Sequence, residues 1–123
     1  MVGVPRGPRG GILKEVATTV ATTTATAIAN ITDTTSESWG YKRKAYLVSL
    51  YIFNPGSSTA TVYLYDGATS NLKFEGKVPA GDFLDGYYPN SLGHMEFKDR
   101  DNMKILFKTT KQPVFVHISY EEL

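Results

Sequence analysis

The sequence contains no cysteine and only two histidines among its 123 residues. The missing cysteine excludes disulfides, thiol nucleophiles, and the zinc and iron–sulfur sites that need Cys ligands. Charge of one sign is also missing, since 13 basic residues against 12 acidic ones leave a formal net charge of +1. Such a chain has no overall field that attracts nucleic acid or an anionic membrane. We therefore expect neither as a partner.

Long apolar runs are absent as well. None approaches the roughly 20 residues of a membrane-spanning helix. No apolar core follows Arg6 and Arg9, as it does in a signal peptide, so no signal peptide is predicted. A length of 123 residues is enough for one domain and too little for two.

Catalytic and metal-binding motifs are lacking too. His94 and His117 do not have the H-x-x-x-H or H-x-H spacing of a metal site, and His117 is expected on a sheet face. The chain has no nucleophile elbow, no dinucleotide-binding glycine motif and no P-loop. Residues 99–102 (DRDN) lack the spacing and the distal Glu of a calcium loop. We expect no enzyme activity and no cofactor, with no catalytic, cofactor-binding or metal-binding residue.

Aromatic residues divide the chain. All fifteen of them, Trp39 with eight Tyr and six Phe, lie in residues 39–123, and none lies in residues 1–38. Because aromatic side chains dominate the burial of a core, we expect an independent domain over 39–123. Residues 1–38 are then predicted to form an extended N-terminal arm rich in Gly and Pro, and then in Ala and Thr.

The predicted arm has two sections. Residues 1–14 combine Gly and Pro with three cations, Arg6, Arg9 and Lys14, and no acid, which indicates an irregular, extendable segment. Residues 16–35 fit both helical and strand spacing, but their nine threonines favour extended structure. A strand of Ala and Thr buries little alone, so it should be added to a sheet. The pattern leaves open whether that sheet is its own or a neighbour's.

The region after residue 38 reads as short strands separated by turns. Asn54-Pro55-Gly56 and Asp66-Gly67 are strong turn signals. Residues 44–53 are apolar on both alternating sets, which is typical of a central strand covered on both faces. The predicted strands are 44–53, 59–65, 72–78, 83–88, 96–98, 103–109 and 113–120.

This strand pattern predicts the fold class and one candidate surface. Short strands at regular spacing with no helix indicate an all-β, antiparallel β-sandwich, jelly-roll-like or Ig-like, with the extended N-terminal arm. A small barrel is the alternative, and the Ala/Thr tract could supply the eighth strand of a jelly roll. Tyr63 and Tyr65 share the face opposite Val62 and Leu64, so one of these pairs should line the core and the other should lie under a second layer or a partner.

The stretch from Tyr51 onward resembles the small β-sandwich proteins that decorate or cement the heads of tailed viruses. The resemblance rests on residues 52–56 (IFNPG), 61–67 (TVYLYDG), 78–81 (VPAG) and 116–122 (VHISYEE). It implies a bacteriophage-like virion protein, assembled in the host cytoplasm, without enzyme activity. It also implies a homo-oligomer, with a trimer favoured, that is seated on the major capsid protein or other virion subunits.

An arm that crosses to another subunit gives the candidate partner-binding residues. A segment of 38 residues spans up to ~125 Å when fully extended. The expected contacts in the arm are Arg6, Arg9, Lys14, Val16, Val20 and Ile28, and those on the strand face opposite Val62 and Leu64 are Tyr63 and Tyr65. Other virion roles remain open: a minor or jelly-roll capsid protein, a head–tail connector or a tail protein. The alternative of another class is a carbohydrate-binding or adhesive module that uses Trp39, Tyr41, Tyr87 and Tyr88. Lys42-Arg43-Lys44 beside Trp39 and Tyr41 could clamp single-stranded nucleic acid, but is more typical of a solvated strand edge.

Overall fold

The computed structural model describes residues 10–21, 23–31, 45–87, 96–97, 104–110 and 113–123. Nine strands and no helix occur in these residues, so the protein is all-β as predicted. The strands are β1 (Ile12–Val20), β2 (Thr26–Asn30), β3 (Ala45–Phe53), β4 (Ala60–Asp66), β5 (Leu72–Val78), β6 (Phe83–Tyr87), β7 (Glu96–Phe97), β8 (Lys104–Thr109) and β9 (Val114–Glu122).

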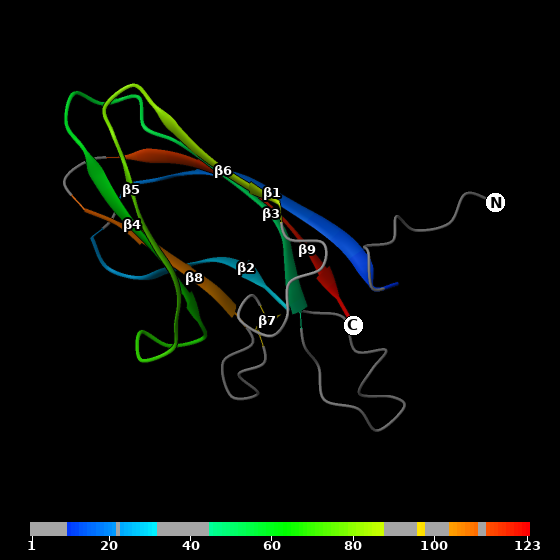
Figure 1. Ribbon diagram of the computed structural model, residues 1–123. Coiled ribbons are helices and arrows are strands. Elements are labelled where there is room, and N and C mark those ends of the chain that lie inside the picture. The colour runs from blue at the N-terminus through cyan, green and yellow to red at the C-terminus, as the bar shows by residue number, and fades with distance from the viewer. Residues whose placement is uncertain (1–9, 22, 32–44, 88–95, 98–103, 111–112) are drawn as a thin grey trace.

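The strands form two antiparallel sheets stacked as a sandwich (Figure 1). Sheet A has the order β1-β9-β3-β6, with the two-residue β7 also paired to β3, and sheet B has the order β2-β8-β4-β5. The eight longer strands pair in a nested way: β1 with β9, β2 with β8, β3 with β6 and β4 with β5. Nested pairing spread over two sheets is the topology of a jelly roll. Of the two sandwich types that the sequence predicts, the structure has this one.

The core lies between the two sheets and is built from alternating residues of the long strands. In β4, Val62 and Leu64 are fully buried, while Thr61 and Tyr63 are half-buried on the outer face. In β9, Val114, Val116 and Ile118 are fully buried. The period of two along each strand therefore separates a core face from an outer face, as the sequence indicates. The same alternation buries Ile105 and Phe107 of β8.

The predicted boundary at residue 38 needs a correction. Residues 12–20 pair along their whole length with β9, and residues 26–30 pair with β8, so both strands belong to the sandwich itself. Val20, Ala29 and Ile31 are buried members of its core. The Ala/Thr tract has little to bury alone, and the two sheets supply the partners that it needs. Of the predicted irregular section at residues 1–14, residues 12–14 belong to β1, and residues 1–9 lie outside the described residues.

Strand β3 departs from strict alternation. The sequence places Val48, Leu50 and Ile52 on one face and Leu47 on the other. A bulge between Leu47 and Ser49 shifts the pairing with β9, so Leu47 is fully buried as are Leu50 and Ile52. An extra residue in one strand changes the face that the following residues present. The central position predicted for this strand is confirmed, since β3 lies between β9 and β6.

Asn54 ties together two turns at one end of the sandwich. Its fully buried side chain donates from Nδ2 to the carbonyl oxygens of Ser58 (2.9 Å) and Val78 (2.8 Å), and its Oδ1 accepts from the Gly56 N–H (2.9 Å). Its backbone N–H donates to the Asp82 carbonyl, and its own carbonyl accepts from the Gly81 N–H. The β3–β4 connection and the β5–β6 turn are thus held together by the side chain, the backbone N–H and the carbonyl of one residue.

Candidate functional site

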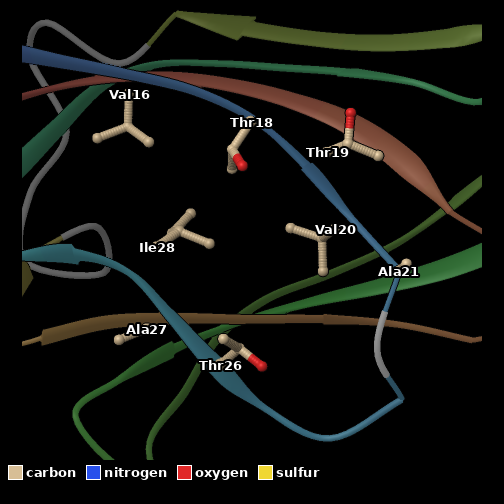
Figure 2. A pocket seen from close by; sticks show the side chains of 8 residues that line it. All are labelled: Val16, Thr18, Thr19, Val20, Ala21, Thr26, Ala27 and Ile28. Carbon is tan, nitrogen blue, oxygen red and sulfur yellow. The ribbon is translucent and has the colours of Figure 1, made fainter.

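Among the described residues, β1 is an edge strand of sheet A and β2 is an edge strand of sheet B, on the same side of the sandwich. A groove of about 490 Å³ lies between these two edge strands (Figure 2). We call it the edge groove. It is lined by Val16, Thr18, Thr19, Val20, Ala21, Thr26, Ala27 and Ile28, none of which carries a charge.

Strand pairing sets the direction of the lining side chains. Val16, Thr18 and Val20 stand opposite Ile118, Val116 and Val114 of β9, which all face the core. These three β1 residues therefore share the core-facing side of sheet A, and Figure 2 shows them pointing toward β2.

Ile28 reaches the same groove from β2. The pairing of β2 with β8 is irregular between Ala27 and Ala29, so Ile28 is the extra residue of a bulge. Ile28 and Val16 are both half-buried and pack against the core. Three of the predicted contact residues, Val16, Val20 and Ile28, are thus brought together in the edge groove.

The edge of β1 carries few of the features that prevent unwanted pairing. Its nine residues (ILKEVATTV) contain no Pro, and the charged residues Lys14 and Glu15 lie toward its start. Residues 16–20 carry no charge at all. Natural edge strands are usually blunted by Lys, Pro or bulges, because an unpaired edge is a template for another strand. Within the described residues, β1 pairs on one side only.

Lys14 has a different role from the expected arm contact. Its ammonium Nζ lies 2.9 Å from Oε2 of Glu122, whose side chain is fully buried. Lys14 pairs with Tyr120 and Ile12 pairs with Glu122, so Lys14 and Glu122 lie on neighbouring strands, two residues apart in the register. The ion pair with Glu122 therefore holds Lys14 within its own domain, and not out toward an acidic partner.

The same carboxylate acts on a neighbouring tyrosine. Burial, and then the Glu122 carboxylate, raise the pKa of the Tyr120 phenol above its ordinary value of 10.0.

Tyr63 and Tyr65 lie on the outer face of sheet B, away from the edge groove. Val62 and Leu64 line the core, so the tyrosines occupy the other face, as the alternation predicts. Their rings stack with centroids 6.3 Å apart, and the Lys108 ammonium lies 4.6 Å from the Tyr63 centroid. Tyr65 is buried and Tyr63 is half-buried, so this pair is covered in part by its own domain.

Several predicted contacts fall outside the described residues. Among the arm cations these are Arg6 and Arg9. Among the sugar-platform candidates they are Trp39, Tyr41 and Tyr88, while Tyr87 is the last residue of β6. The basic run at 42–44, His94 and the acidic turn at 99–102 also fall there.

The outer face of sheet A carries aromatic residues that the sequence analysis did not single out. Phe83 is 56% exposed and Phe115 is 37% exposed. The Phe83 ring stacks on Tyr51, with centroids 5.8 Å apart, and both phenylalanines stand opposite Phe53 in the pairing. The alternation of Phe115 against Val114 and Val116 was the available signal for this face. His117 lies on the same face, half-buried and paired with Tyr51, which confirms its expected place on a sheet face.

The described residues hold no group of three or more His, Asp or Glu side chains arranged for a metal ion. In the same part of the chain, no helix has the length and apolar character needed to cross a membrane.

Comparison with known proteins identifies no family for this chain. No protein-family model matches the chain, and no curated protein matches it. One similar solved structure comes from "Bacillus endospore appendages form a novel family of disulfide-linked pili". It is 16% identical, covers 91% of this chain and 88% of that one, and has a TM-score of 0.47. This likeness is too low to identify a family or a function, and a chain without cysteine cannot form disulfide links. None of these comparisons shows a relation to head decoration proteins, so that resemblance stays a prediction.

Proposed function

We propose that this protein is a structural subunit of a virion, which decorates or cements a capsid through contacts between subunits. The observation that carries the proposal is the poorly protected edge of β1 beside the uncharged edge groove. A strand edge with an adjoining apolar groove binds extended segments by backbone hydrogen bonds, and the groove accepts their side chains. These are the properties of a protein that assembles.

Charge and fold support the same role. A formal net charge of +1 gives little repulsion between copies, and proteins near zero charge associate readily. Jelly rolls are common in viral capsid proteins. Weak contacts repeated over a symmetric particle add up through effective concentration, so no single strong site is needed. The proposed partner is the major capsid protein or another virion subunit. The cationic side chains of Arg6 and Arg9 suit an acidic groove on that partner.

The location of the protein on particles tests this proposal. Particles should be purified from cultures of the organism that supplies the gene, and labelled with gold-conjugated antibody against the chain. We expect regularly spaced label on the head surface. Label confined to the tail or to the head–tail joint replaces decoration by another virion role. Antigen that never sediments with particles overturns the proposal.

The two arginines require a separate test. A deletion of residues 1–38 removes β1 and β2 along with the arm, so it cannot isolate the arm's effect. The double variant Arg6→Ala with Arg9→Ala removes two cations and leaves every strand intact. The matched control, Lys73→Ala with Lys77→Ala, removes two cations from β5. We expect lower occupancy on purified particles for the arginine variant only, and equal occupancy for both variants contradicts a role of the arginines.

Carbohydrate binding is the second candidate, and one observation favours it. Phe83 is 56% exposed and is backed by the stacked Tyr51 ring, which forms an aromatic platform on the outer face of sheet A. A glycan array with the wild-type chain and Phe83→Ala decides this point. Binding that is lost in the variant supports an adhesive module, and an array without any bound glycan removes this candidate.

A further inference from the structure

We propose that the edge groove is closed by a second copy of this chain, through antiparallel pairing of β1 with β1 of the partner subunit about a two-fold axis at Val16. Sheet A then continues from one copy into the other. This inference rests on the proposed assembly role and names the partner at the edge groove. It predicts an even-numbered assembly built from dimers, in place of the trimer that the resemblance implies.

The first argument is the availability of the edge. All nine residues of β1 pair with β9 on one side, and no described strand pairs with the other side. Nine residues are long for a strand at a sheet edge, where short and blunted strands are usual. Pairing with an equal strand of a second copy satisfies the whole edge at once. A two-fold axis makes this contact closed and self-complementary.

The second argument is the register. When two β1 strands align over their full length, Ile12 faces Val20 of the partner subunit, and Leu13 faces Thr19 of the partner subunit. Lys14 then faces Thr18 of the partner subunit, and Val16 meets its own copy on the axis. The two side chains of each opposed pair point to the same face of the continuous sheet. This holds because the paired positions differ by an even number of residues, and side chains alternate between the faces with a period of two. No charge faces a like charge.

Shorter registers are penalised by the two charged residues. A shift of two residues in one direction places Glu15 opposite its own copy in the partner subunit. A shift of four residues in that direction places Lys14 opposite its own copy. Directly opposed like charges destabilise a strand pair. Sliding in the other direction leaves Ile12 and Leu13 unpaired. The full-length register is therefore the one that the sequence of β1 specifies.

The third argument is the fate of the edge groove. Val16 and Thr18 of the partner subunit continue the core-facing side of sheet A past the edge, over the space beside Ile28 (Figure 2). Val16 and Ile28, which are half-buried in one copy, become more buried. The groove is uncharged, and the side chains that enter it are Val and Thr, so no charged group loses its hydration there.

A charge swap at one position tests the register. Thr18→Lys places an ammonium opposite Lys14 of the partner subunit, whereas the matched Thr18→Glu places a carboxylate there. Both variants lose the same hydroxyl and add a charge of equal size. Sedimentation equilibrium over a concentration series should show dimers of the 13.6-kDa chain, with the dissociation constant of Thr18→Lys roughly tenfold above that of Thr18→Glu. Equal constants for the two variants contradict the register.

Cross-linking provides an independent measurement, since the chain has no cysteine of its own. Leu13→Cys and Thr19→Cys lie on the outer face of β1, where Thr19 is exposed and Leu13 is half-buried. The two positions face each other in the proposed dimer, within reach of a disulfide. Each position is roughly 20 Å from its own copy. Oxidation of the two variants mixed together should give a linked dimer, and oxidation of either one alone should not.

The outcomes separate this inference from the proposed function. A monomer or a trimer in solution, together with no cross-link in the mixture, overturns the two-fold pairing, while the particle-labelling result still stands. A specific cross-link in the mixture, combined with antigen that never sediments with particles, supports the pairing and rejects the virion role. Cross-linking that is equal in the single variants and in the mixture also overturns the pairing.

Discussion

Replacing Asn54 by alanine should lower the free energy of unfolding by about 2–4 kcal/mol. The hydrogen bonds of the fully buried side chain include two donated from Nδ2 to the carbonyls of Ser58 and Val78 and one accepted by Oδ1 from Gly56. A net value of about 0.5–1.5 kcal/mol for each bond gives a range of roughly 1.5–4.5 kcal/mol, and the expected loss of about 2–4 kcal/mol is its central part. The Val78 carbonyl bond is the buried one, so it should contribute most, because water cannot replace the lost donor there.

Thermal and urea unfolding measure this loss. For a domain of this size, a loss of about 2–4 kcal/mol lowers Tm by roughly 8–16 °C. Ser57→Ala is the matched control, because Ser57 lies in the same β3–β4 connection and is exposed. That variant should stay within about 0.5 kcal/mol of wild type. Asn54→Asp keeps the acceptor but loses both donors, so it should be at least as unstable as the alanine variant at neutral pH.

One result would refute the reasoning. If Asn54→Ala unfolds within about 0.5 kcal/mol of wild type, the two turns are held by their backbone bonds alone. These are the Asn54 N–H to the Asp82 carbonyl and the Gly81 N–H to the Asn54 carbonyl.

Two further predictions concern the end of sheet A. In Gly11→Ala the new Cβ lies 2.6 Å from the carbonyl oxygen of Glu122, so backbone must move. We expect a loss of about 1–3 kcal/mol in urea unfolding. Gly76→Ala meets only the Phe74 ring and Leu84 side chain, and it should lose less; the reverse order contradicts this account. Burial, and then Glu122, raise the pKa of Tyr120 above 10.0. The folded state therefore disfavours the phenolate, and this stabilising contribution is complete below pH 10 and is lost as pH rises through the folded pKa. Stability should fall less above pH 10 in Tyr120→Phe, as followed by circular dichroism, and identical pH profiles for the two proteins exclude this linkage.

Most of the fold could be predicted from local patterns. Residues 72–78 are β5 as expected, and the boundaries of β3, β4 and β8 differ by one residue. The turn residues and the alternation of apolar side chains act within a few positions, so sequence alone contains them. The bulge in β3 is different, since the face that Leu47 presents is decided by its pairing with β9, which is remote in sequence.

The candidate site could be predicted only in its parts. Val16, Val20, Ile28 and Ile31 stand out as the larger apolar residues of the Ala/Thr tract, and the first three line the edge groove. Their meeting depends on β1 and β2 joining different sheets, which no local pattern specifies. The sequence predicts Lys14 to be an arm cation that contacts a partner, whereas its ion pair with Glu122 joins residues from opposite ends of the sequence. Long-range pairing decided each of these points.

The nested pairing predicts an order of folding. The β4–β5 pair closes the shortest loop, followed by β3–β6, β2–β8 and finally β1–β9. Closing a longer loop costs more entropy, so the pairs should form from the middle of the chain outward. Of the described strands, β1 comes first in the sequence and pairs with β9, which comes last. Among the described strand pairs, we therefore expect the β1–β9 pair, which carries the edge that we propose joins two copies, to form last.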